Sequence, residues 1–340
     1  MKALFLLLTV VMLTVSACKK NISEKNTAIS GTAVDGPVTC TGDTWEQVQN
    51  FVGWHYKTCL VYNNKAYFFH HGQEDNPYHN TITIYDGSSW QTIQSNIPAT
   101  VLTTYVLVKF VIGNKAYFSS PDCHNIFAYD FASNTWTPKS PFPGPTRSFV
   151  SSFAIGNKGY LTAGRSGYTH YNDLWEYDPV ADSWTQKTSF PNFGKTNAAA
   201  FSIGNKGYLL NGVITNLMLD PPYFFYLNDL MQYDPVTDSW DVKTSYPGEP
   251  NAYPECFVSG GYGYAGYGSN KNTDFKDFYR YSPSTDSWSA TSQCPLDVAV
   301  AGFSINSKGY LVGRTDRSST IKMYKYNPKV CAPLGSGGGL

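Results

Sequence analysis

Side chains that can transfer protons or bind ligands are concentrated in a few short stretches of the chain. All six histidines lie in polar segments that we expect to form loops: His55, His70, His71, His79, His124 and His170. The ordinary pKa of histidine lies near neutral pH, so its side chain serves as an acid–base group or a metal ligand. His70 and His71 are adjacent and would point to opposite sides of an extended backbone, and no ligand spacing typical of a metal centre occurs. We therefore predict no metal site and no cofactor.

No motif of a common enzyme class accompanies these histidines. The sequence lacks a G-x-S-x-G elbow, a Walker loop, an H-E-x-x-H pair and an EF-hand run. Lys plus Arg and Asp plus Glu each number 25, so the formal net charge is zero. A nucleic-acid partner would require a basic face, so we predict none, and the charge balance also argues against electrostatic attraction as the main contact with a membrane.

One repeated unit must position these residues. Its first marker is a tyrosine, called the ruler tyrosine below, which recurs every 43 to 56 residues at Tyr67, Tyr117, Tyr160, Tyr208, Tyr264 and Tyr310. Its second marker is a Tyr-Asp turn with a tryptophan seven residues after the tyrosine, as in Tyr177 and Trp184. The sixth copy, Tyr326, lacks this tryptophan, and Trp45 near the N-terminus is left over.

A period near 50 residues with about four strands per unit is typical of a β-propeller. We predict an all-β, six-bladed propeller of four-stranded antiparallel blades. An N-terminal strand that carries Trp45 would complete the last blade, close the ring and remove a free sheet edge.

At these spaced Gly, Tyr and Trp residues, from about Thr41 to Pro333, the chain resembles the kelch-repeat family. Kelch units usually carry a Gly-Gly doublet after the second strand, whereas one glycine remains here, at Gly164, Gly212 and Gly268. The resemblance implies a bacterial lipoprotein with degenerate kelch repeats.

The N-terminus has the features of an export signal followed by a lipid anchor. Residues 1–17 combine Lys2, an apolar run and small residues, which predicts a signal peptide. Val15-Ser16-Ala17-Cys18 resembles a bacterial lipobox, which implies acylation of Cys18. Residues 18–39 would then form the lipidated cysteine and a flexible linker, residues 40–333 the propeller, and residues 334–340 a disordered tail. We expect a monomer in the bacterial cell envelope, periplasmic or surface-facing, that contacts the membrane only through this anchor.

Six further cysteines in an exported chain suggest disulfides. Cys40 and Cys331 flank the two terminal strands expected to pair, so a bond between them would lock the ring. The loops of propeller topology then favour Cys59–Cys123 and Cys256–Cys294, with free buried thiols as the alternative for these two pairs.

One loop position differs in every unit and is our candidate for a ligand site. Thirteen residues before the ruler tyrosine stand Trp54, Thr104, Arg147, Lys195, Asn251 and Asp297. An asymmetric ligand site would produce this variation, and so would drift at an exposed loop. An insertion from Val213 to Leu227, which contains the aromatic segment Pro221 to Tyr226, makes the fourth loop on the same face the longest. The predicted ligand-binding residues are Trp54, His55, His71, His124, Arg147, Arg165, Lys195 and Tyr223.

The favoured interpretation is a non-catalytic propeller that binds a glycan or a cell-envelope protein at its loop-rich face. The alternative is a carbohydrate-active enzyme similar in fold to the six-bladed sialic-acid mutarotases, or an epimerase. Arg147, Arg165 and His170 would then be the acid–base groups. Fold alone does not decide between them.

The anchor hypothesis yields the first testable prediction. The Cys18→Ser variant should lack acyl chains and partition into the aqueous phase of a detergent extraction, because acyl chains contribute about 0.8 kcal/mol for each buried CH₂ group. Immunoblotting of the two phases checks this, and a variant that still fractionates with membranes would contradict the anchor.

Overall fold

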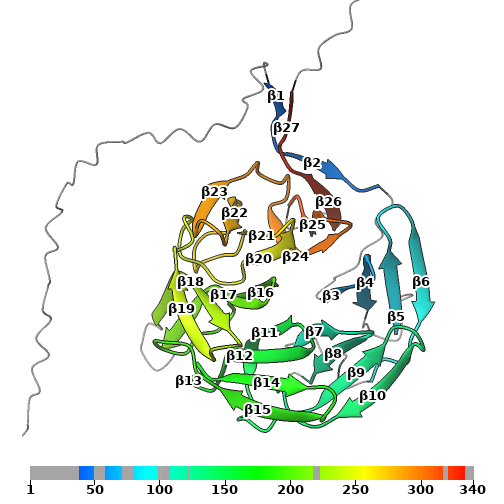
Figure 1. The fold of residues 1–340 in the computed structure, drawn as a ribbon, viewed down its shortest axis with the longest axis vertical. Helices are drawn as coiled ribbons and strands as arrows, with labels where there is room; N and C mark the ends of the chain where they lie inside the picture. Colours follow the sequence, from blue (N-terminus) through cyan, green and yellow to red (C-terminus); the bar gives the residue numbers. More distant parts are fainter. Residues whose placement is uncertain are drawn as a thin grey trace, which may run out of the picture. The chain divides into compact units, whose positions relative to one another are not determined.

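A computed structural model describes residues 38–49, 58–70, 80–98, 101, 108–120, 122–216, 223–316 and 321–333, without the side chains of 38–41 and 330–333. These residues form β-strands, turns and loops, and none of them belongs to a helix long and apolar enough to cross a membrane. Six antiparallel sheets, each a path of four strands, stand in a ring (Figure 1). The predicted six-bladed propeller is therefore confirmed.

The strands follow one another in each blade from the centre of the ring outward. The first and second blades contain β3 (Cys59–Tyr62), β4 (Lys65–His70), β5 (Thr81–Tyr85), β6 (Trp90–Gln94), β7 (Lys109–Ile112), β8 (Lys115–Ser119), β9 (Ile126–Asp130) and β10 (Thr135–Lys139). The third contains β11 (Ser148–Ile155), β12 (Lys158–Ser166), β14 (Leu174–Asp178) and β15 (Ser183–Lys187), with the short β13 (Thr169–His170) paired to β12.

The other three blades repeat this order. They contain β16 (Ala199–Ile203), β17 (Lys206–Asn216), β18 (Tyr223–Asp234) and β19 (Ser239–Lys243), then β20 (Glu255–Ser259), β21 (Tyr262–Gly266), β22 (Phe278–Ser282) and β23 (Ser287–Ala290), then β24 (Val298–Ile305), β25 (Lys308–Arg314) and β26 (Lys322–Asn327). The strand β2 (Thr44–Gln47) pairs with β26 and supplies the outermost strand of the sixth blade. Trp45 lies opposite Tyr326, as Trp184 lies opposite Tyr177 in the third blade. A separate two-stranded sheet joins β1 (Val38–Thr41) and β27 (Val330–Pro333).

The ruler tyrosines hold neighbouring blades together. Each of the six is buried. Tyr160, for example, stacks on Phe153 of the first strand of its own blade, with ring centroids 5.2 Å apart, and contacts Tyr233 of the next blade at 5.6 Å. Aromatic pairs of this kind add to the free energy gained from burying their surface. The regular tyrosine spacing therefore fills the wedge between blades.

A second inter-blade contact forms at the turn between the third and fourth strands of the third, fourth and fifth blades, where an aspartate stands five residues after the tyrosine. Asp238 accepts hydrogen bonds from the Tyr233 hydroxyl of its own blade and from the backbone N–H of Thr188 in the preceding blade, at 2.8 and 3.0 Å. The indole of Trp240 donates to the Thr188 carbonyl at 2.9 Å. The other two aspartates make the same pair of contacts. Asp182 accepts from the Tyr177 hydroxyl and the Ser140 N–H, and Asp286 accepts from the Tyr281 hydroxyl and the Thr244 N–H. We call this arrangement the aspartate latch.

The reduced Gly-Gly doublet has a conformational explanation. Ala163 and Gly164 have φ values of 59° and 90°, so both adopt left-handed backbone, and the same holds at the equivalent pairs Asn211–Gly212 and Tyr267–Gly268. A Cβ at Gly164 would lie 2.7 Å from Val150 and 2.9 Å from the Ser148 carbonyl oxygen. The second glycine is therefore required by space as well as by φ, whereas the first position tolerates Ala, Asn or Tyr.

The latch predicts a specific loss of stability. Asp238→Ala should lower the free energy of unfolding by about 2 kcal/mol, since it leaves the Tyr233 hydroxyl and an inter-blade N–H without their acceptor. Asp241→Ala is the matched control, because Asp241 is an exposed aspartate on β19. Urea unfolding followed by tryptophan fluorescence measures both, and equal midpoints for the two variants would refute a stabilising role for the latch.

Candidate functional site

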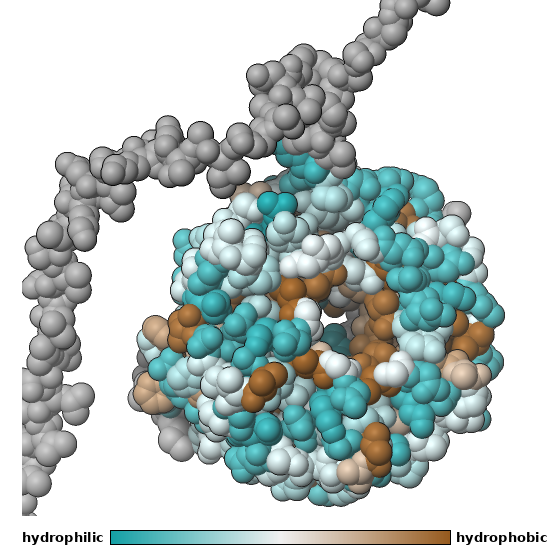
Figure 2. Space-filling view, in the orientation of Figure 1, coloured by the Kyte–Doolittle hydropathy of each residue, from teal (hydrophilic) through white to brown (hydrophobic). Residues whose placement is uncertain are grey.

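A channel runs along the centre of the ring, between the six innermost strands β3, β7, β11, β16, β20 and β24. Each of these strands contacts the innermost strand of both neighbouring blades. The channel holds a cavity of about 750 Å³. Figure 2 shows the opening, with hydrophobic residues gathered around it. This volume lies within the range of small-molecule sites.

Antiparallel order places two kinds of connection on one face, which we call the loop-rich face: the loops between second and third strands, and the connections between blades. At its centre lie Phe149, Asn197 and Tyr253, equivalent residues of the third, fourth and fifth blades, and all three line the cavity. Their φ values are 60°, 56° and 60°. Asn197 N–H donates to the Phe149 carbonyl and Tyr253 N–H to the Asn197 carbonyl, which explains how this unusual backbone is held.

Exposed aromatic side chains are concentrated on the same face. Each of the following is at least half exposed and lies in a connection or loop of blades three to five: Tyr168, Phe193, Tyr223, Phe225 and Tyr253. Tyr223 and Phe225 stand on one side of a long hairpin formed by the ends of β17 and β18, with nearly parallel rings. The hairpin is tied to the third blade, where the Thr215 N–H donates to His170 Nε2 at 3.2 Å.

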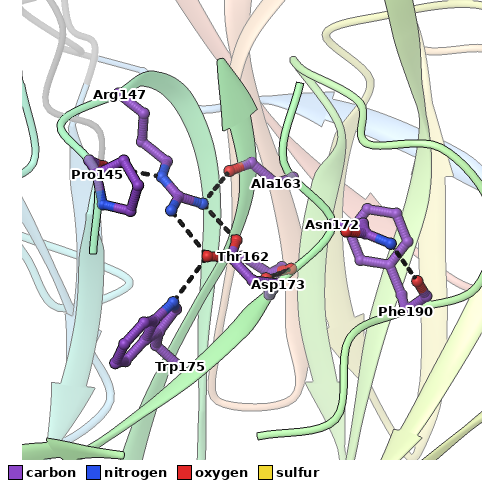
Figure 3. Close-up of polar contacts among 8 residues, drawn as sticks. All are labelled: Pro145, Arg147, Thr162, Ala163, Asn172, Asp173, Trp175 and Phe190. Atoms are coloured by element: carbon purple, nitrogen blue, oxygen red, sulfur yellow. Dashed lines mark hydrogen bonds and ion pairs between the residues drawn. The ribbon is translucent and has the colours of Figure 1, made fainter. Parts of the chain in front are cut away.

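Arg147 does not lie exposed in this face, contrary to expectation. Its side chain is fully buried and forms a bidentate ion pair with Asp173. Figure 3 shows the guanidinium between Asp173 and the carbonyls of Pro145 and Ala163, with the Trp175 indole donating to the same carboxylate. The Tyr171 ring covers the guanidinium at 3.8 Å. All its donors are directed inward, so Arg147 is a structural residue of the third blade.

The same correction applies to other members of the variable position. Lys195 is 1% exposed, and its ammonium bonds both oxygens of Asp229 at 2.8 and 3.0 Å. Burial lowers the pKa of Lys195, against the opposing charge of Asp229. Asn251 is buried and accepts from the Asn211 amide, while Asp297 pairs at the surface with Lys276. The variation at this position therefore follows the local partner, which lies in the same blade for Arg147 and Lys195 and in the preceding blade for Asn251 and Asp297. Trp54 and Thr104 lie outside the described residues.

Arg165 and His170 are brought together. They are register partners on β12 and β13. The Arg165 guanidinium lies over the Phe149 ring, 5.4 Å from its centroid, and donates to the Gly167 carbonyl. Burial is the main cause that lowers the pKa of His170, and the charge of Arg165 lowers it further. His170 therefore favours the neutral form that can accept from Thr215.

Two predicted site residues remain within the described part of the chain, His124 and Tyr223; His70, which was expected in a loop, instead ends β4. The His124 side chain is exposed in the loop between β8 and β9, and Tyr223 is exposed on the hairpin. His70, by contrast, is buried, and its Nε2 lies 2.8 Å from the Thr83 hydroxyl. His55, His71 and His79 lie outside the described residues. Among the described residues, no group of three His, Cys, Asp or Glu side chains could hold a metal ion.

Two of the predicted disulfides are wrong. Cys59, Cys123, Cys256 and Cys294 are free thiols. Each packs in a different cluster of buried side chains between blades, so neither Cys59–Cys123 nor Cys256–Cys294 is positioned to bond. Burial raises the pKa of Cys123, Cys256 and Cys294 to about 12, which makes these thiols unreactive at neutral pH. The side chains of Cys40 and Cys331 lie outside the described residues, and that bond stays a prediction.

Sequence reasoning missed the charged residues of the channel wall. Lys109 and Glu255 both line the cavity. Burial raises the pKa of Glu255 to about 7, although the charge of Lys109 and the Gly302 N–H act in the opposite direction. A signal was available, because Lys109 stands eight residues before a ruler tyrosine and Glu255 nine. Both residues begin the innermost strand of their blade, β7 and β20.

The buried ion pair gives the third prediction. Asp173→Ala should lower the free energy of unfolding by about 3 to 5 kcal/mol, because it leaves the Arg147 guanidinium buried without a counter-charge. The double variant Arg147→Met/Asp173→Ala should recover part of this loss, since no charge then remains. A double-mutant cycle by urea unfolding measures both, and strictly additive effects would contradict a direct interaction.

Comparison with known proteins supports the fold. Residues 146–191 match the kelch motif, and this segment covers almost the whole third blade, from just before β11 to just after β15. Comparison with curated proteins finds no match. Among solved structures, the one titled "Structure of YjhT" aligns with a TM-score of 0.54 and 17% sequence identity, over 64% of this chain and 74% of that chain. The motif and the six blades together identify the chain as a kelch-repeat β-propeller.

Proposed function

We propose that this propeller is a non-catalytic binding protein that holds a glycan against its loop-rich face. The observation that carries the proposal is the group of five exposed aromatic side chains on blades three to five: Tyr168, Phe193, Tyr223, Phe225 and Tyr253. Large apolar rings exposed on a rigid scaffold are typical of binding surfaces, because leaving them in water brings no gain in stability.

The spacing of these rings favours a glycan. Tyr223 and Phe225 have centroids 6.5 Å apart at an interplanar angle of 19°, so they present two nearly parallel surfaces to one side of the hairpin. Tyrosine combines an apolar ring with a hydroxyl, which suits the apolar face and the hydroxyl rim of a pyranose. A protein partner is the other ligand class for such a surface, since Tyr and Phe are also enriched at protein interfaces.

The proposed location is the bacterial cell envelope, through acylation of Cys18. The support comes from the sequence, where an apolar run and small residues precede this cysteine. A lipid anchor followed by a linker would hold the loop-rich face close to envelope glycans without any contribution from surface charge.

The enzymatic alternative has weaker support. Arg165 and His170 are adjacent, as acid–base catalysis of sugar epimerisation or mutarotation would require. Arg147, however, is committed to Asp173, and His170 Nε2 already accepts from Thr215. Two assays on free sugars separate the hypotheses: NMR of anomer interconversion detects mutarotation, and incorporation of solvent deuterium at carbon detects epimerisation. A binding protein would leave both rates unchanged.

The fourth prediction tests the binding face. Tyr223→Ala and Phe225→Ala should each weaken glycan binding about tenfold, which corresponds to about 1.4 kcal/mol, with little change in thermal stability because both side chains are exposed. Val236→Ala is the control, since Val236 is exposed in a turn on the opposite face.

A glycan array followed by calorimetry on the strongest hit measures these effects. The proposal fails if no glycan binds, if Val236→Ala weakens binding as much as the aromatic variants do, or if capture from envelope extracts returns only a protein ligand.

A further inference from the structure

The channel wall contains one complete ring of equivalent residues. The residues eight positions before the ruler tyrosines all line the cavity, one from each blade: Cys59, Lys109, Ser152, Ala200, Cys256 and Gly302. Five of these side chains are small or absent, which is why the channel stays open at this level. The single long side chain is the lysine.

Two ionisable side chains, Lys109 and Glu255, lie on opposite sides of the channel. Lys109 comes from the second blade and Glu255 from the fifth, and these blades are three steps apart in a ring of six. No ion pair joins Lys109 to a carboxylate among the residues that the structure describes, and its side chain is exposed to the channel. Lys109 lines the cavity together with Glu255, Cys59 and Cys256, and its charge lowers the pKa of each of these groups.

The surroundings of Glu255 determine its charge state. Burial raises its pKa to about 7, and it accepts a hydrogen bond from the Gly302 N–H. The other titratable side chains that line the cavity are Lys109 on β7, Cys59 on β3, Cys256 on β20 and Tyr253 just before β20. Burial keeps both thiols protonated, while β11 and β16 contribute only neutral residues to the cavity. Below pH 7 the channel therefore contains one ammonium and one neutral carboxylic acid.

We propose that the central channel binds a small organic carboxylate with an apolar body. The Lys109 ammonium is the counter-charge, the protonated Glu255 donates a hydrogen bond to the ligand carboxylate, and the apolar body packs against Val150, Ala198 and Val300. Hydrogen bonds to an ionised acceptor are the stronger ones, and apolar contacts add free energy in proportion to the buried area. This site lies inside the channel and shares only Tyr253 with the aromatic surface proposed for glycans.

The charge of Lys109 and the neutral state of Glu255 favour a carboxylate ligand over an amine. An ammonium ligand would face Lys109 without a carboxylate as long as Glu255 is neutral. A carboxylate, by contrast, loses its hydrogen-bond donor and gains a repelling charge when Glu255 ionises. Binding of the carboxylate should therefore weaken as the pH rises through the pKa of Glu255.

The experiment is a calorimetric titration of the full chain in detergent micelles with phenylacetate, with a titration into empty micelles subtracted. Phenylacetate is fully ionised at both pH 6 and pH 8.5. If only the form with neutral Glu255 binds, the affinity should fall up to about 30-fold between these pH values, given a pKa of about 7. Phenylacetamide should bind more weakly than phenylacetate at pH 6, and phenethylamine should not bind.

Single-residue variants test whether Lys109, Glu255 and the cavity itself are responsible for phenylacetate binding. Lys109→Met should weaken binding at least tenfold at both pH values, whereas Lys65→Met, an exposed lysine at the short-turn end of β4, should leave it unchanged. Glu255→Gln should retain binding at pH 6, because the amide still donates, and should abolish the pH dependence. Ala200→Leu should block the cavity without touching either charge.

Several outcomes would overturn the proposal: no binding of phenylacetate, tighter binding of phenethylamine at pH 6, unchanged binding in Lys109→Met, or a persistent pH dependence in Glu255→Gln. If Lys109→Met does not fold, Ala200→Leu and Glu255→Gln decide the question alone. The glycan-site variant Tyr223→Ala should keep full phenylacetate binding, so failure of one site does not imply failure of the other.

Discussion

The aspartate latch is the interaction on which the propeller depends most. Each latch carboxylate accepts from a tyrosine of its own blade and from a backbone N–H of the preceding blade, so the bond that orders one sheet also fixes its neighbour. Burial raises the pKa of Asp238, but the hydrogen bonds from Thr188 and Tyr233 and the charge of Lys187 outweigh this and lower it overall. The latch is therefore ionised at neutral pH, and its contribution is lost only as pH falls through this lowered value. In a radial repeat such nearest-neighbour contacts largely set the stability.

The latch also explains why its position holds Asp or Asn. The residues Asp182, Asp238 and Asp286 have φ values of 48°, 49° and 45°, and Asn134 of the second blade has 54°. Left-handed backbone is tolerated by Asp and Asn far better than by other non-glycine residues. Asn134 accepts from Tyr129 and donates to the Gln94 carbonyl, so an amide performs the same function without a charge. Turn geometry and inter-blade bonding thus select the same two residue types.

The sequence was sufficient for the architecture because the latch, the ruler tyrosine and the tryptophan recur at nearly constant spacing. It was insufficient for Arg147 and Lys195, since nothing near them in the chain shows their partners. Asp173 lies 26 residues after Arg147, and Asp229 lies 34 residues after Lys195. A charged residue at a variable position of a repeat can therefore be mistaken for a ligand-binding residue. The structure shows instead that both residues are paired with an aspartate of their own blade. The ionisable residues of the channel were missed because the sequence around Glu255 is that of an ordinary inner strand. Glu255 comes to lie opposite Lys109 only when the blades form a ring.

The same rigidity that stabilises the ring keeps Lys109 and Glu255 apart. The inner strands are joined by side-chain hydrogen bonds to neighbouring backbones, from Ser151 to the Ala198 carbonyl at 2.8 Å and from Ser202 to the Ala154 carbonyl at 2.6 Å. Ser152 also accepts from the Lys109 N–H at 2.9 Å, which holds the start of β7 in place. These bonds hold β7, β11 and β16 in fixed positions around the channel. A charged ligand that enters a partly apolar cavity interacts more strongly with a charge such as that of Lys109 than it would at the open surface, which supports the proposed ligand site in the channel.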